Sequence, residues 1–350
     1  ICNGRGCVWL RIQQAHAKMA TTSATPEEEV GDCKRRRICN GSKVVVRRAV
    51  ANDVSAASDV VYEAFRLRAD ETKTFTGVGE TPGTSKKVVE IAVASQHAFV
   101  ACDKESSKII GFNVLVCDNA PSFYGIGPLA VARNCQHSGV GRELLLSSLD
   151  HVDPSGHTRL MVDANNEPAF ALYIKSGFET KSTMAVIERP PASSIPTSRT
   201  GLREGLCFRM MKSDDLESCI ALCKQVAGCD RQGEIRTAMT SDQGIFGQKP
   251  ALRVAVKNGE IVGYTTGLTY NGHTVCQSVQ VAMALFEDIQ SDPSLQASTF
   301  RVFMPCAEHP ELLSLCLKTG WRLLKHCLFM VRGSYEAPLA SGVFIPTADG

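Results

Sequence analysis

A glycine-rich turn at residues 136–141 is the part of the sequence whose residue types and spacing most directly suggest chemistry. It reads Gln-His-Ser-Gly-Val-Gly and joins an apolar run to a helix-like stretch. Gly139 and Gly141 let the backbone turn tightly and come close to a bulky group. The first N–H groups of a helix have no partner within it and carry partial positive charge, so the junction is suited to a phosphate. The alternative is a connection that binds nothing.

The composition is that of a globular protein of about two domains. The 350 residues carry a net charge of +2, and 44% of them are hydrophobic. This charge gives no general attraction to nucleic acid or to an anionic membrane, and no apolar run approaches the roughly 20 residues of a membrane span. The 15 cysteines include no Cys-x-x-Cys pair. We therefore expect reduced thiols, no metal site and a reducing compartment.

The first 42 residues lack hydrophobic periodicity and are predicted to be a disordered extension. A cytoplasmic location is the first expectation. Residues 1–18 are basic and free of acids, as an organellar targeting segment would be, and "KRRR" at 34–37 is either a nuclear signal or a solvated charge run.

The hydrophobic patterns after residue 42 predict a mixed α/β fold that positions the turn. Helices are expected at 53–65, 84–96, after the turn from residue 140, and at 167–177. Strands are expected at 42–50, in a hairpin over 98–117, and at 122–132, 158–165 and 179–188.

The second half of the chain repeats the first. A stretch rich in Pro, Ser and Thr at 189–204 is predicted to be a linker. After it, "LYIKSGF" at 172–178 is echoed by "LCLKTGW" at 315–321, and Arg47 with Asp53 is echoed by Arg209 with Asp215. Echoes in the same order indicate an internal duplication. The predicted domains are residues 43–188 and 205–347.

Two motifs give the chain a family resemblance. "IGPLAVARNCQHSGVGRELL" at 126–145 and "VDANNEPAFALYIKSGFE" at 162–179 follow the expected elements in order. In both motifs and in element order the chain resembles the GNAT superfamily of acyl-CoA N-acyltransferases. The resemblance implies two tandem GNAT folds, each a mixed, mostly antiparallel sheet flanked by helices, with an active first copy and a degenerate second copy.

The resemblance also implies a cofactor site for acetyl-CoA, which serves as co-substrate. Backbone amides of the turn would hold the pyrophosphate, the strand before it would pair with the pantetheine arm, and the Leu129 amide would polarise the thioester carbonyl. Tyr173 matches the family's usual general acid for the leaving thiolate. The residues expected to bind the cofactor are Leu129, Ala130, Val131, Gln136, His137, Ser138, Gly139, Val140, Gly141, Arg142 and Asn166.

The expected function is transfer of an acetyl group to the amine of a small molecule or peptide. The general base is unassigned, because residues 119–142 contain no Asp or Glu. Tyr124, His137, a water chain and Asp163 are candidates, and Asp163 is equally explained as a capping or salt-bridging residue. The alternatives are an acyl-CoA-binding scaffold without turnover, or an acyltransferase with another donor or a hydroxyl acceptor.

The second copy is expected to lack the cofactor site. Its "CQSVQVAMALFEDIQ" at 276–290 contains no glycine, and Cys316 stands where the first copy has Tyr173. We expect this copy to pack on the first and to help shape the acceptor site through "TYNGHT" near His273. The first copy is expected to bind coenzyme A without it.

Overall fold

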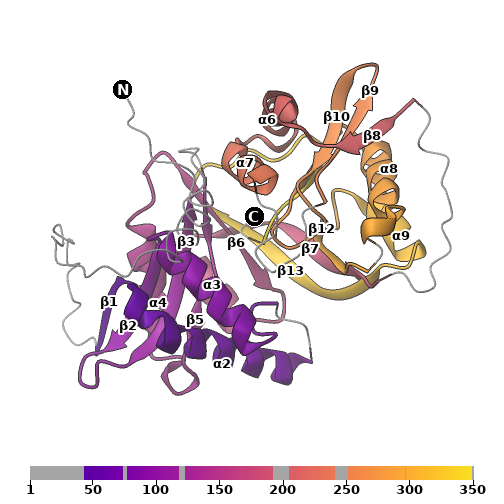
Figure 1. Cartoon of the computed structure of the whole chain (residues 1–350). Coiled ribbons are helices and arrows are strands. Elements are labelled where there is room, and N and C mark those ends of the chain that lie inside the picture. The colour runs from indigo at the N-terminus through magenta and orange to yellow at the C-terminus, as the bar shows by residue number, and fades with distance from the viewer. Residues whose placement is uncertain are drawn as a thin grey trace, which may run out of the picture. The chain divides into compact units, whose positions relative to one another are not determined.

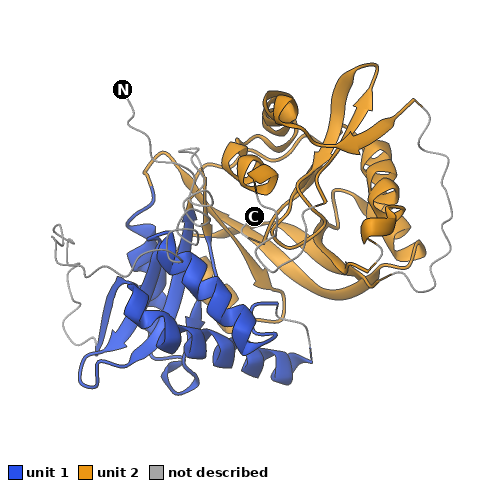
Figure 2. Cartoon of the chain, in the orientation of Figure 1, with its two compact units in different colours: residues 1–116, 126–152 blue, residues 117–125, 153–350 orange. Residues whose placement is uncertain are grey.

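The computed structural model describes residues 43–73, 77–117, 123–191, 205–240, 251–295 and 297–348. The extension 1–42 and most of the predicted linker, residues 192–204, lie outside the described residues. Contacts divide the chain into two compact units, one of residues 1–116 and 126–152 and the other of residues 117–125 and 153–350 (Figure 2). The predicted domain boundary at 189–204 follows the sequence repeat, whereas the compact units divide the chain earlier.

The first unit is an antiparallel sheet with strand order β1-β2-β3-β5 (Figure 1). Its strands are β1 (Val44–Arg48), β2 (Ala98–Asp103), β3 (Ile109–Cys117) and β5 (Ala130–Val131). Its helices are α2 (Val54–Thr72), α3 (Pro82–Ala94) and α4 (Val140–Leu149), with 3-10 turns at η1 (Ala51–Asp53) and η2 (Arg133–Cys135).

Strands β2 and β3 are buried on both of their faces. Val100 on β2 and Phe112 on β3 belong to the core under α2 and α3. Gly111, next to Phe112, faces the other way toward α4. The first unit therefore has three layers, with the sheet in the middle.

The second unit contains two sheets and the remaining elements. Its strands are β4 (Phe123–Ile126), β6 (His157–Asp163), β7 (Glu179–Arg189), β8 (Cys207–Met210), β9 (Arg253–Lys257), β10 (Glu260–Thr265), β11 (Thr274–Cys276), β12 (Phe300–Pro305), β13 (Arg322–Arg332) and β14 (Val343–Ile345). Its helices are α5 (Glu167–Lys175), α6 (Leu216–Ala227), α7 (Gln232–Thr240), α8 (Val279–Gln290) and α9 (Pro310–Lys318), with η3 (Ser213–Asp215) and η4 (Pro293–Leu295).

One sheet of this unit mixes strands from both halves of the sequence. Its order is β4-β6-β13-β7-β12, so β13 of the second half lies between β6 and β7 of the first. Strand β7 in turn pairs with β12 and β13 of the second half. Each half therefore completes the sheet of the other. The two repeats therefore share one sheet.

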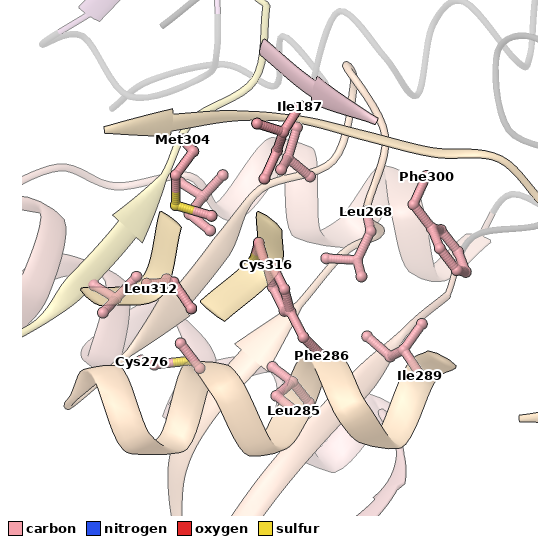
Figure 3. Close-up of a cluster of buried hydrophobic side chains, with 14 of the residues drawn as sticks. Ile187, Leu268, Cys276, Leu285, Phe286, Ile289, Phe300, Met304, Leu312 and Cys316 are labelled. Atoms are coloured by element: carbon pink, nitrogen blue, oxygen red, sulfur yellow. The ribbon is translucent and has the colours of Figure 1, made fainter. Parts of the chain in front are cut away.

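The other sheet has the order β14-β11-β10-β9-β8 and belongs to the second half alone. Helix α6 packs on one face of it, and α8 packs on the other. The core under α8 and α9 is a cluster of buried hydrophobic side chains that includes Phe286, Leu312 and Cys316 (Figure 3).

The internal duplication extends to individual hydrogen bonds. Asp215 accepts two bonds from Arg209, at 2.6 and 2.7 Å, and one from the Lys212 N–H at 2.7 Å. Asp53 accepts from Arg47 at 2.6 and 2.8 Å, and from the amide three residues before it at 2.8 Å. The same residues thus form the same turn in both halves.

The structure differs from the sequence-based elements at the strand expected over 122–132. This segment is divided into β4 and β5, and residues 127–129 belong to neither. Pro128 has no N–H to donate to a neighbouring strand, which accounts for a break at this position. The break separates the part that pairs with β6 from the part that pairs with β3.

Candidate functional site

Helix α4 begins at the glycine-rich turn. Its N-terminal cap is Gly139, whose φ of 91° lies in the left-handed region that glycine adopts without penalty. No side chain caps this helix end. The Glu143 N–H makes the first bond of the helix, to the Gly139 carbonyl at 3.1 Å. The N–H groups of residues 140–142 precede that bond and are positioned for an anion.

The space beside Gly139 is open, and another glycine holds the helix in place. A Cβ added to Gly139 would meet no atom within 4 Å. By contrast, a Cβ on Gly111 would lie 2.7 Å from the side chain of Leu144 and 3.1 Å from that of Val140. Gly111 therefore allows α4 to pack closely on β3, which fixes the direction of its first turn.

Side chains of the turn hold its backbone. The Gln136 side-chain amide donates to the Val131 carbonyl at 3.3 Å, and the Ser138 hydroxyl donates to the Cys135 carbonyl. His137 has a φ of 62° and is exposed. The predicted role of Gln136 as a brace for the turn is consistent with this contact.

The strand before the turn leaves a backbone donor on one side. Just after β5, the Ala132 N–H donates to the Ile110 carbonyl of β3 at 2.9 Å, and Ala130 on β5 pairs with Phe112 of β3. Backbone groups of an antiparallel strand alternate between its two sides. The Val131 N–H therefore points away from β3, where an extended ligand could accept from it.

Tyr173 is on α5 in the second unit. It is 8% exposed and lies edge-on to Phe178, with ring centroids 5.8 Å apart. Burial raises the pKa of the Tyr173 phenol to about 12. The phenol is therefore protonated throughout the physiological pH range and is available as a donor.

Asn166 caps helix α5. Its side-chain oxygen accepts a hydrogen bond from the Ala169 N–H at 3.3 Å. This is the capping role that asparagine commonly has at a helix start. The predicted contribution of Asn166 to cofactor binding stays a prediction.

Two of the candidate bases are engaged in other contacts. Asp163, at the end of β6, forms an ion pair of 2.6 Å with Lys325 on β13. The Tyr124 hydroxyl accepts from the Asp153 N–H at 3.3 Å, and burial raises the pKa of this phenol. Asp163 is thus a salt-bridging residue, and Tyr124 is protonated at neutral pH.

Lys325 had no signal in the sequence. It reaches Asp163 only because β13 lies beside β6, a pairing of strands far apart in the chain. A lysine in an alternating strand is ordinarily read as solvated, whereas the side chain of Lys325 is only 13% exposed.

The second half has a different helix start in place of the turn. Helix α8 is capped by Ser278, whose hydroxyl accepts from the Val281 N–H at 3.4 Å. The Ser278 hydroxyl therefore takes up one of the N–H groups that an anion would need. Cys316, at the position of Tyr173, is 3% exposed within the apolar core of Figure 3.

The segment "TYNGHT", expected to help shape the acceptor site, has its histidine in the interior. His273 is fully buried, with its Nδ1 2.9 Å from Glu234 and its Nε2 3.0 Å from the Tyr264 hydroxyl. It therefore presents no surface to an acceptor. Tyr270 of the same segment packs on Phe303, with ring centroids 5.0 Å apart and ring planes tilted by 39°. Burial raises the pKa of the Tyr270 phenol, and Asp163 adds to this effect.

Two other site types are not found in the described part of the chain. Its side chains include no group of three or more His, Cys, Asp or Glu residues placed to hold a metal ion. None of its helices is long and apolar enough to cross a membrane.

Comparisons with known proteins agree with the motifs. Residues 65–178 match the family model described as "Acetyltransferase (GNAT) family". The fold is similar to that of a putative acetyltransferase from Pyrococcus horikoshii, with a TM-score of 0.64, 14% identity, and 91% of this chain and 99% of that chain covered. It is also similar to a GCN5-related N-acetyltransferase from Sphaerobacter thermophilus, with a TM-score of 0.55, 13% identity, and coverage of 85% and 98%. Among curated proteins, no sequence matches the chain. Because these two structures cover 91% and 85% of this chain, the shared fold extends over both halves of the sequence.

Proposed function

We propose that this chain, which contains a domain of the GNAT acetyltransferase family, transfers an acetyl group from acetyl-CoA to an amine through its first repeat. The single observation that carries this proposal is the start of α4. An uncapped helix end, a glycine in the left-handed region and open space beside it stand together at the family's motif.

The N–H groups of residues 137–142 would hold the pyrophosphate of coenzyme A. Charge favours this, because the helix dipole places partial positive charge where the anion would lie. The contrast with α8 supports the assignment to one repeat. Ser278 satisfies the first turn of α8 with its own hydroxyl, whereas the first turn of α4 has no such partner.

Leu129 would supply the oxyanion contact. Leu129 directly precedes β5, and Ala130 and Val131 lead on toward Gln136. A backbone N–H that does not need to reorient stabilises the oxygen of a tetrahedral intermediate effectively. The pantetheine arm would accept from the Val131 N–H, which points away from β3.

Tyr173 would donate a hydrogen bond to the leaving sulfur. A phenol with a pKa of about 12 keeps its proton until a strong acceptor forms beside it. Burial raises the pKa of a thiol as it raises that of a phenol, so a desolvated thiolate is such an acceptor. Proton transfer then accompanies the departure of coenzyme A.

The acceptor amine must lose a proton during the reaction. Asp163 is neutralised by Lys325 and Tyr124 is protonated, so neither is suited to remove that proton. His137 or a water chain is left for the role. An acceptor that is already neutral near pH 7 would need no dedicated base, which favours amines of low pKa.

The experiment that tests this proposal measures acetyl transfer against a mixed panel of small-molecule and peptide amines, with products identified by mass. Transfer to one class of amine supports the N-acetyltransferase assignment. Coenzyme A binding without transfer or hydrolysis would instead favour a scaffold. Transfer to a hydroxyl or from a longer acyl donor would correct the reaction class.

A further inference from the structure

Two cysteines meet at the end of α6 in the second repeat. Cys223 lies in the last turn of the helix, and Gly228 follows it with a φ of 65°, its N–H bonded to the Lys224 carbonyl. A left-handed residue after a helix folds the next residue back onto the last turn. Cys229 is therefore brought onto Cys223, and the two thiols are hydrogen-bonded to each other.

Two buried arginines flank the Cys229 sulfur. Nη1 of Arg159 lies 3.8 Å from Sγ, and Arg231 also bonds to this sulfur. Both guanidinium groups are fully buried, and each lies 4.7 Å from the ring centre of Phe123. One arginine comes from β6 of the first repeat and the other from the second repeat.

Of the other ionisable groups around the pair, a carboxylate offsets part of this positive field, whereas an imidazole and two phenols are neutral. Glu234 bonds to Arg231 at 2.8 and 2.9 Å and compensates that guanidinium. His157 accepts from Arg159 at 2.7 Å, and burial together with the two arginines lowers its pKa to about 4, so it is neutral. The phenols that face the pair, on Tyr264 and Tyr335, are protonated because burial raises the pKa of each.

These contacts shift the pKa values of the two thiols in opposite directions. The Cys223 hydrogen bond, with the two arginines, lowers the pKa of Cys229 well below its usual value and outweighs the opposite effect of burial. The same bond and burial raise the pKa of Cys223. Cys219, one turn earlier on α6, has no such partners, and burial raises its pKa to about 12. Only a thiolate is a strong sulfur nucleophile.

We propose that Cys229 and Cys223 form an oxidation site at which a hydroperoxide produces a disulfide. The Cys229 thiolate attacks one peroxide oxygen, the O–O bond breaks, and the departing hydroxide is protonated to water, leaving a sulfenic acid. The Cys223 sulfur then attacks the sulfenic sulfur, the S–O bond breaks, and a second water leaves with the Cys223 proton. Two thiols lose two electrons, and one hydrogen peroxide is reduced to two waters.

The site is independent of the proposed transferase activity. Cys229 is 4% exposed and Cys223 is fully buried, so the oxidant must be small, and local opening of the helix end must admit it. Oxidation removes a negative charge from between Arg159 and Arg231. Because Arg159 is on β6, the change reaches a strand of the first repeat.

The test uses the reduced full-length chain treated with hydrogen peroxide, followed by denaturation with an alkylating agent and tryptic digestion. Residues 213–224 carry Cys219 and Cys223, and residues 225–231 carry Cys229. The expected product is these two peptides joined, two hydrogens lighter than their sum and separated again by dithiothreitol. Cys223→Ser and Cys229→Ser should abolish the link, and Cys219→Ser should leave it unchanged.

A pH series distinguishes a resident thiolate from simple proximity of two thiols. The rate of link formation should rise far less between pH 6 and pH 8 than the about 75-fold rise of a thiol with a pKa of about 8.5. A steep rise, or no link while the exposed Cys207 is oxidised, would overturn the proposal. The wild-type protein alone gives both readouts, so the result does not depend on how the variants fold.

Discussion

Gly139 combines two properties that no other residue type would supply at the start of α4. Its backbone is in the left-handed region, and the position of its missing side chain faces open space. The turn requires the left-handed backbone, and the open space leaves room for a ligand. Gly259 in the β9–β10 turn has a φ of 85° and equally open surroundings, but it lies outside the proposed site. The same substitution at both glycines therefore separates the effect on the backbone from the effect on ligand binding.

Gly139→Asp should weaken coenzyme A binding by at least about 100-fold, because a carboxylate would stand where the pyrophosphate is proposed to bind. Gly259→Asp carries a similar backbone cost and should leave the affinity unchanged. Calorimetric titration of both folded variants compares them directly. Equal affinities in the two variants would refute the phosphate role of the turn.

Tyr173→Phe should lower kcat by about 100-fold or more and leave coenzyme A affinity within about twofold, since the lost contact belongs to the transition state. Steady-state kinetics with the best acceptor from the panel, together with titration of coenzyme A, measure the two effects separately. Unchanged turnover would make Tyr173 a packing residue against Phe178.

The sequence is informative about site residues whose role is local. The glycines of the turn, the cap at Asn166 and the repeated Arg–Asp turns all depend on neighbours within a few residues. Lys325 beside Asp163 and Arg159 beside Cys229 depend on strands and helices that meet only in the folded chain. Alternation and propensity carry no information about such partners, so the buried charges could not be predicted.

At the scale of elements, α4 and α8 start at equivalent places in the two repeats but differ in the residue that caps them. Helix α4 starts at a bare glycine, and α8 starts at a serine that satisfies its own backbone. Helix α7 of the second repeat carries a buried carboxylate. Its Glu234 joins Arg231 and His273 in the interior, so this helix is attached by charge as well as by apolar contacts.

The Glu234 contacts predict that the protein loses stability in acid. Burial by itself would raise the pKa of Glu234, but Arg231 and His273 outweigh it and hold the pKa at about 2, below the usual 4.5. Stability from this carboxylate is fully present above about pH 4.5 and is lost as the pH falls toward 2, with a contribution of about 3 kcal/mol. Urea unfolding at pH 7 and pH 3 measures the loss.

Glu234→Gln should flatten this pH dependence and lower stability at pH 7, because Arg231 would be left buried without its carboxylate. Asp70→Asn is the matched control, since its ion pair with Arg66 is exposed and should contribute little. A Glu234→Gln profile as steep as that of the wild type would show that other carboxylates cause the acid transition.

Most elements follow from periodicity, and the exceptions have local or topological causes. The helices of the first repeat and the strands on either side of the turn are near their predicted positions. The break at residues 127–129 follows from Pro128, whose missing N–H was visible in the sequence. The exchange of β7 and β13 was not visible, because each strand carries the same pattern whichever partner it pairs with.

At the scale of the whole molecule, the repeats are duplicated in sequence and joined in structure. Strand β13 supplies a neighbour to β6 and to β7, and β7 supplies a neighbour to β12. Neither repeat retains a complete sheet when the other is removed. Loss of the second repeat thus removes a central strand from the first.

A chain truncated after residue 201 should therefore be insoluble or unfolded, with no binding of coenzyme A. The same fragment expressed together with residues 202–350 should recover solubility, because β13 can then occupy its place in trans. Circular dichroism and coenzyme A titration on each preparation test this. A folded, coenzyme A-binding first fragment on its own would contradict the strand exchange.

The position of β13 late in the chain delays completion of the sheet during synthesis. Strand β7 ends at Arg189 and β13 ends at Arg332, so 143 residues must be added before the gap between β6 and β7 can close. At about 5–20 residues per second, a ribosome needs about 7–30 s for that stretch. During this interval the nascent chain presents two strand edges that other chains can pair with. The yield of this protein in a cell should therefore depend on chaperones that shield the first repeat until translation is complete.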